Sequence, residues 1–246
     1  MAKQSSGRCK SLKSAYSVFN KGIQTAKRIY GPASKWLEYS HESFSDKSYH
    51  PRVAEKVIGL AFLSMVAAWE EFVEEVFLGY MAGATTPDGY APELMIGKCQ
   101  NKVHAMQVLG AAVNGDPARA LKWSDWPWVS NVAKVHFKYG APFTSLPKLY
   151  LERLKDAQGI RNRVAHNSAK AKKGFKTLVN RLVGETDKSP LPKGMAPGTL
   201  LACEPEAGLF PVFTICPIDD YEWPDFFCSY TSLYLEAASL LIPVEH

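Results

Sequence analysis

The segment from residue 51 to residue 81 reads PRVAEKVIGLAFLSMVAAWEEFVEEVFLGYM, and it decides the fold of the chain. Its apolar side chains recur at three- and four-residue spacings and fill most of the surface of a helix. Pro51 suits the first turn of that helix, and Gly83 stands just beyond its end. A helix that is apolar on most sides lies inside a bundle, so the sequence predicts an all-α protein.

Apolar residues at helical spacing predict further helices over residues 10–39, 92–113, 146–170, 172–183 and 224–242. The first of these is expected in two pieces, because Gly31 and Pro32 interrupt it. Residues 42–49 form a polar linker. We therefore expect residues 1–50 to be an N-terminal helical extension and residues 51–246 to be an antiparallel helical bundle.

Residues 185–217 differ in kind, because they are rich in Pro and Gly. Two short apolar runs, at 199–202 and 210–215, are compatible with at most a short β-hairpin. We expect this segment to be an insert outside the bundle core, bordering either the functional cleft or a dimer contact.

Composition excludes several classes of protein. The 246 residues are 46% hydrophobic and 22% charged, which is typical of a soluble globular chain. The most apolar stretch, Val57 to Trp69, is too short to cross a membrane, and the first residues do not resemble a signal peptide. We therefore expect a cytoplasmic protein without a membrane partner.

Five widely spaced Cys indicate free thiols, and they predict neither a zinc site nor a disulfide framework. A net charge of +5 permits nucleic-acid binding.

The segment Arg161-Asn162-Arg163-Val164-Ala165-His166 is the best indication of function. A guanidinium group binds phosphate through two parallel hydrogen bonds, and a neutral imidazole accepts a proton near pH 7. These groups are sufficient to cut RNA without a metal ion. On one helix, however, Arg161 would lie about 140° from His166, whereas Asn162 would share its face. Two copies related by a two-fold axis would bring both side-chain types into one cleft.

Residues 160–166 resemble the R-x4-6-H signature of the HEPN family (higher eukaryotes and prokaryotes nucleotide-binding), in which a polar residue commonly follows the Arg. Members of that family are antiparallel helical bundles. Small and acidic residues at 64–71, together with a closing helix near 226–242, agree with this pattern. The resemblance covers residues 50–170 and the C-terminal helix, about two thirds of the chain.

The resemblance implies a metal-independent endoribonuclease that acts as a homodimer in a bacterial toxin or antiviral defence system. By position, Arg161 and His166 would be catalytic and Asn162 supporting. The ribose 2′-OH would attack its own phosphate, which gives a 2′,3′-cyclic phosphate and requires no cofactor or metal. The implied partners are RNA, a second copy of the chain, and an antitoxin or regulatory protein. Some HEPN toxins carry a modified Tyr two residues after the His. Ser168 stands there in this chain.

Several further residues admit two interpretations. Ser64, Glu71 and Glu75 form one polar stripe on the helix 51–81, which either bonds to Arg161 or Asn162 or faces solvent. Glu70 and Glu74 are expected to face water. A lysine cluster after the motif either attracts RNA phosphates or is a solvated helix face; its members are Lys170, Lys172, Lys173 and Lys176.

Trp123, Trp126 and Trp128 are expected to pack in the core rather than stack on bases. Two alternatives to the nuclease remain open. One is a HEPN-like module that binds RNA or protein without cutting, and the other is a bundle in which Arg161 and His166 only satisfy buried acids.

Overall fold

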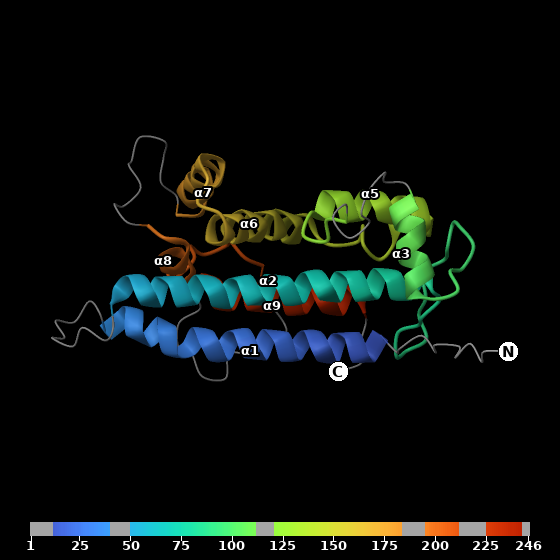
Figure 1. Cartoon of the computed structure of the whole chain (residues 1–246), viewed down its shortest axis with the longest axis horizontal. Coiled ribbons are helices and arrows are strands. Elements are labelled where there is room, and N and C mark those ends of the chain that lie inside the picture. The colour runs from blue at the N-terminus through green and yellow to red at the C-terminus, as the bar shows by residue number, and fades with distance from the viewer. Residues whose placement is uncertain (1–11, 40–49, 112–120, 184–194, 212–224, 243–246) are drawn as a thin grey trace. The chain divides into compact units, whose positions relative to one another are not determined.

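The computed structural model describes residues 12–39, 50–111, 121–183, 195–211 and 225–242 (Figure 1). Within these ranges the chain is all-α, as expected, and strand pairing is limited to one isolated bridge between Leu94 and Phe137. None of the described helices is long and apolar enough to cross a membrane. The elements are α1 (Leu12–Tyr39), α2 (Pro51–Met81), α3 (Lys102–Ala111), α5 (Trp126–His136), the 3-10 turn η1 (Lys138–Gly140), α6 (Lys148–Ala165), α7 (Ala169–Leu182), α8 (Pro197–Leu201) and α9 (Phe226–Leu241).

The chain divides into two compact units that use different parts of the same long helices. The aromatic unit consists of the described residues up to Phe19, of Trp69–Leu146, and of those from Ala237 onward. The motif unit consists of the described residues within Asn20–Ala68 and Pro147–Glu236, and it carries the Arg161–His166 segment.

The core of the motif unit joins α1, α2 and α9 through aromatic rings. Tyr30 stacks on Phe227 with ring centroids 4.0 Å apart, and Phe62 meets Tyr230 edge to face at 5.3 Å. Such pairs contribute roughly 0.5–1.5 kcal/mol beyond the area that they bury. The residues expected to form an N-terminal extension therefore share a core with the bundle.

The start of α2 provides the surface on which α6 and α8 pack. A Cβ atom added at Gly59 would lie 3.4 Å from a methyl group of Val164, so α2 touches the motif-bearing end of α6. Gly198 lies against the backbone carbonyl of Glu55, where no side chain would fit. Thr199 Oγ1 also donates a hydrogen bond of 2.7 Å to Glu55 Oε1.

These contacts correct the expectation for the insert. Residues 199–202, expected as a strand of a hairpin, belong to or follow the helix α8, and Leu200 and Leu201 are fully buried. The two leucines find an apolar surface in the bundle, and Pro197 suits a helix start. Helix α8 thus belongs to the core, whereas Glu204 and residues 206–208 of the insert are exposed. Residues 212–215 of the second apolar run lie outside the described ranges.

The aromatic unit is built around the ring of Phe77. Its centroid lies 4.8 Å from that of Phe143, 5.0 Å from that of Phe137 and 5.4 Å from that of Trp123. Trp123 and Trp126 are 7% and 4% exposed, which confirms that they pack in the core. They are therefore not available to stack on bases.

Helices α1 and α3 differ from expectation, whereas α2 begins and ends as predicted. Helix α1 runs through Pro32 without a break, because Tyr30 and Ala33 on either side are buried by tertiary packing. Helix α3 begins only at Lys102. The residues before it instead form backbone hydrogen bonds with the end of α5, including Met95 N to His136 O at 2.9 Å. The expected linker at 42–49 lies outside the described residues.

Candidate functional site

The motif lies where α6 ends and α7 begins. Helix α6 stops at Ala165, and His166 caps it with an extended backbone (φ −133°, ψ 135°). The amide of His166 still donates to Asn162 O at 3.0 Å, which closes the last turn. Ser168 Oγ then accepts a hydrogen bond from the amide of Ala171 and starts the next helix. The expectation of a helix continuing to residue 170 is wrong, because Ser168 is a good N-cap and begins a new helix.

This boundary changes the geometry of the proposed catalytic pair. Because His166 no longer has helical dihedral angles, the angle of about 140° expected between it and Arg161 does not apply. Arg161 is half-buried on α6, and its Nη1 donates to Asn162 Oδ1 at 3.3 Å. His166 is exposed. The last turn of α6 and its cap thus carry a guanidinium group that is hydrogen-bonded to its neighbour and an imidazole that is open to solvent.

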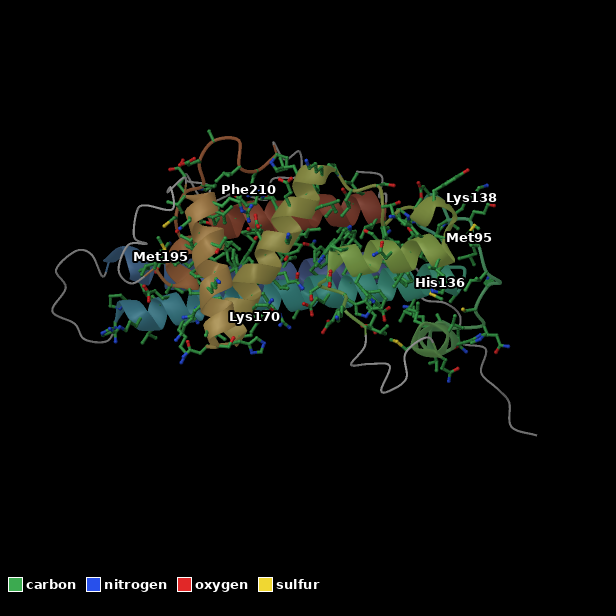
Figure 2. The ribbon with its side chains drawn as sticks, turned by 90° about the horizontal axis from the view of Figure 1, so that it is seen from above. Met95, His136, Lys138, Lys170, Met195 and Phe210 are labelled. Carbon is green, nitrogen blue, oxygen red and sulfur yellow. The ribbon has the colours of Figure 1, made fainter. Side chains whose placement is uncertain are left out.

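Helix α7 is amphipathic, with a cationic side that begins directly after the motif. Phe175, Leu178, Val179 and Leu182 are buried on its inner side. Lys170 lies at the corner between α6 and α7 (Figure 2). It belongs to a group of exposed lysines on the outer sides of α7: Lys170, Lys172, Lys173 and Lys176. The structure thus gathers the cationic groups and the motif within one helical hairpin.

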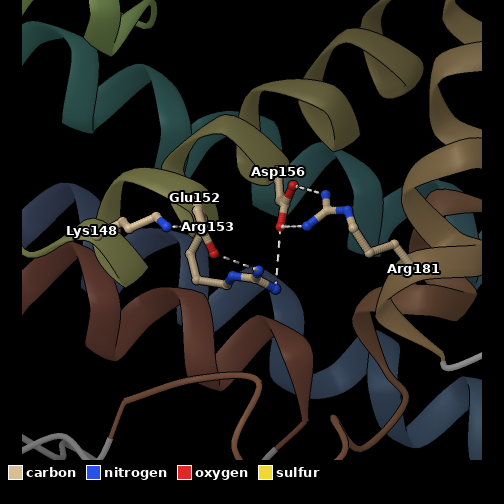
Figure 3. Close-up of polar contacts among 5 residues, drawn as sticks. All are labelled: Lys148, Glu152, Arg153, Asp156 and Arg181. Atoms are coloured by element: carbon tan, nitrogen blue, oxygen red, sulfur yellow. Dashed lines mark hydrogen bonds and ion pairs between the residues drawn. The ribbon is translucent and has the colours of Figure 1, made fainter.

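A buried ion network holds that hairpin together (Figure 3). Asp156 of α6 is 2% exposed and accepts two hydrogen bonds from the guanidinium group of Arg181 on α7. Arg153 Nη1 lies 3.2 Å from the same carboxylate, and its guanidinium group lies 6.0 Å from the ring of Phe210. Between α6 and α7 there is also a pocket of about 350 Å³, lined in part by Asp156 and Arg181.

The charges of this network influence one another. Hydrogen bonding to the Asp156 carboxylate raises the pKa of Arg181. Burial, followed by the charge of Asp156, raises the pKa of the Tyr230 hydroxyl on α9. Sequence reasoning missed this network, although Arg153 and Asp156 stand three residues apart on the buried side of α6. Since Asp156 is held by two guanidinium groups, we interpret the role of the network as structural: it holds α7 against α6.

The expected polar stripe on α2 does not face the motif as one unit. Glu71 is exposed and belongs to the aromatic unit, while Glu75 forms an ion pair with Lys102. Ser64 is half-exposed in the motif unit. It lies about 140° around α2 from Gly59, the residue that meets Val164 of α6. These positions agree with the solvent-face interpretation.

The expectation that Glu74 faces water is wrong. Its side chain is half-buried, and burial together with the charges of Glu75 and Glu71 raises its pKa. The ring of His136 is also buried, and this burial lowers its pKa.

No group of three or more potential metal ligands occurs in the described part of the chain. Within the same ranges, Cys99, Cys203 and Cys228 are free thiols. Comparison of the chain with protein-family models, with curated proteins and with solved structures found no match.

Proposed function

We propose that the protein is a metal-independent endoribonuclease of the HEPN type. One observation carries this proposal: the Arg161–Asn162 pair, the exposed His166 and the lysines of α7 lie together around the junction of α6 and α7. Phosphate binding, proton transfer and electrostatic attraction of RNA are therefore available at one corner of the motif unit.

The chemistry follows from these groups. His166 accepts the proton of a ribose 2′-OH, and the 2′ oxygen attacks the adjacent phosphorus atom. The bond from phosphorus to the 5′ oxygen breaks, and this oxygen takes up a proton from an acid. Arg161 binds the phosphate and stabilises the charge that develops on it. The products are a 2′,3′-cyclic phosphate and a 5′-OH, and only RNA can react because DNA has no 2′-OH.

We further propose that the active form is a two-fold homodimer, in which His166 of the second copy supplies the acid. The exposed surface of α2 beside the motif supports this. Val53 and Leu60 stand two turns apart on one side of α2 and are 54% and 52% exposed. Leu60 directly follows Gly59, which touches the motif helix at Val164. Exposed apolar residues in such a group are typical of a protein interface.

The biological role that we propose is that of a toxin or antiviral effector controlled by an antitoxin or another regulatory protein. This role derives from the family resemblance of residues 160–166 alone.

The test is cleavage of a labelled RNA oligonucleotide in the presence of EDTA. We expect cleavage by the wild-type protein, and loss of cleavage by at least ~100-fold in His166→Ala. His50→Ala is the matched control, because His50 is also an exposed histidine of the motif unit. A single 2′-deoxy substitution at the cleaved nucleotide should abolish cutting there. Strict dependence on magnesium, or cleavage at the deoxy position, would refute the mechanism.

A second candidate is an RNA-binding module that does not cut. The observation that favours it is that His166 stands at the end of α6, where its backbone leaves the helix. The cationic groups could bind phosphate there without any contribution from this imidazole. RNA binding that is unchanged in His166→Ala, without cleavage by either protein, would establish this candidate instead.

A further inference from the structure

Tyr139 is the most exposed large hydrophobic side chain in the described part of the chain, with 84% of its surface accessible. Its backbone has φ 58° and ψ 7°, which is the left-handed region. Bulky residues rarely adopt this conformation, which Gly and Asn tolerate far better. Among the described residues, Tyr139 is the one non-glycine with a positive φ.

The turn around Tyr139 is fixed on both sides. The amide of Gly140 donates to Phe137 O at 2.8 Å, and Thr144 Oγ1 donates to Tyr139 O at 2.8 Å. Phe137 and Phe143 are fully buried at either end of the turn. The chain thus holds a strained residue firmly while its ring remains in solvent. Strain of this kind persists where the surroundings enforce it, and it is concentrated at functional sites.

One lysine stands beside the ring, and the stem of a second lies against the turn that carries it. Lys138 Nζ lies 5.9 Å from the centroid of Tyr139. The stem of Lys134 passes next to Gly140, where an added Cβ atom would lie 3.0 Å from Lys134 Cγ. Lys138 also forms an ion pair with Glu93, but both side chains are largely exposed, so the pair is easily exchanged for another anion. Lys138 is labelled in Figure 2.

An exposed aromatic ring beside a cation, on a turn that a second lysine contacts, matches the chemistry of a single-stranded nucleic acid. An unpaired base stacks on the ring, and its phosphates are attracted by the ammonium groups. We propose that Tyr139, with Lys134 and Lys138, is a stacking platform for an unpaired base of single-stranded RNA. This inference deepens the proposed function, on which it rests, by naming single-stranded RNA as the substrate class.

The test measures binding separately from cleavage. Fluorescence anisotropy of a labelled oligouridylate reports binding to the full chain, with His166→Ala present in every protein so that RNA stays intact. Tyr139→Asn removes the ring but tolerates the left-handed backbone, and we expect it to weaken binding by roughly 5- to 100-fold. Tyr139→Phe keeps the ring and should bind like the parent. Val103→Ala, at a position that is 68% exposed in the same unit, is the control and should also bind like the parent.

A stability measurement complements the binding data. Tyr139→Gly removes the backbone strain, so we expect Tm to rise by roughly 1–4 °C while the affinity for the oligouridylate falls as in Tyr139→Asn. This pair of results would show that Tyr139 lowers the stability of the protein and supports RNA binding. A fall in both Tm and affinity in the glycine variant would overturn the proposal.

Other outcomes also overturn the platform. These are equal affinity of Tyr139→Asn and its parent for the oligouridylate, absence of binding by the parent, and a change of oligomeric mass in Tyr139→Asn with unchanged RNA affinity, which indicates a protein contact. Failure of the nuclease proposal is distinguishable from these results. In that case the protein with His166 intact does not cut RNA, yet binding still depends on Tyr139.

Discussion

The two units of this chain differ sharply in charge, although the same long helices pass through both. Among the described residues, the motif unit carries sixteen Lys and Arg against eight Asp and Glu, whereas the aromatic unit carries six against seven. The whole chain has a net charge of only +5. A mild average therefore conceals a strongly basic unit beside a nearly neutral one, and it is the basic unit that carries Arg161 and His166.

Their interiors differ in a related way. The aromatic unit is stabilised by a cluster of rings around Phe77, while the motif unit combines stacked rings with the buried ion network of Asp156. We expect substitutions in the core of the aromatic unit to lower the stability of the protein most. Substitutions on the basic surface of the motif unit should reduce function while leaving stability nearly unchanged.

Phe77→Ala should have the largest effect on stability, with a loss of about 3–5 kcal/mol in the free energy of unfolding. The ring is fully buried among other rings, and its removal leaves a cavity. Urea denaturation followed by circular dichroism measures this loss. Val18→Ala in the same unit, at a position that is 61% exposed, should change stability by less than about 0.5 kcal/mol. Equal effects of the two substitutions would contradict the assignment of the core.

Asp156→Ala should cost about 3 kcal/mol, because the buried Arg153 would keep only the more distant, partly exposed carboxylate of Glu152, 3.8 Å away. Arg181→Ala should cost less, about 1 kcal/mol, since the Arg181 side chain is 50% exposed. Chemical denaturation of both variants tests this order. If Arg181→Ala is the more damaging of the two, the attachment of α7 matters more than the buried charge.

Arg161 tests the separation of function from stability in the motif unit. Arg161→Ala should lower RNA cleavage by at least ~100-fold, and Arg161→Lys should recover only part of it, because an ammonium group cannot bind phosphate through two parallel bonds. Tm should stay within about 2 °C of wild type, since the side chain is only half-buried. A variant that cuts at the wild-type rate would remove Arg161 from the mechanism.

The lysine side of α7 should act through electrostatic attraction alone. Lys172→Ala combined with Lys173→Ala is expected to weaken RNA binding. It should also lower the slope of log K against log salt by about one for each phosphate that the protein no longer neutralises. Both residues are exposed, so stability should not change. Anisotropy titrations at several salt concentrations measure the slope. An unchanged slope would support the interpretation of a merely solvated helix face.

Glu74→Gln should have the smallest effect, and its effect should depend on pH. Burial and the charges of Glu75 and Glu71 raise the pKa of Glu74 in the folded protein. The favourable contribution of the protonated carboxyl group is thus complete at low pH and is lost as the pH rises through the raised value. At pH 7 the amide variant should be more stable by a degree or two in Tm, roughly. Below about pH 4 this advantage should vanish. A constant difference between pH 4 and pH 7 would exclude titration of Glu74 as its cause.

The sequence predicted best where the determining interactions are local. The bounds of α2 follow from the apolar pattern of residues 51–81 and from Pro51, and the core role of Trp123 and Trp126 follows from their size and apolarity. It predicted less well where distant residues compete with local preference. Residues 93–95 read as helix but pair with the backbone at 136–138, and 199–202 read as strand but bury Leu200 and Leu201 in a helix.

The candidate site shows the same division. The amino-acid sequence by itself supplied the residue types of the motif, because R-x4-H is a pattern along the chain. Only the tertiary structure decided that Asp156 and Arg181 join α6 to α7, and that Glu71 and Ser64 belong to different units. It also brought out Tyr139, whose left-handed backbone is enforced by contacts on both sides of the turn. Periodicity and spacing describe a side chain's neighbours along one helix. Burial, backbone strain and ion pairing between helices depend on residues that meet only after the chain has folded.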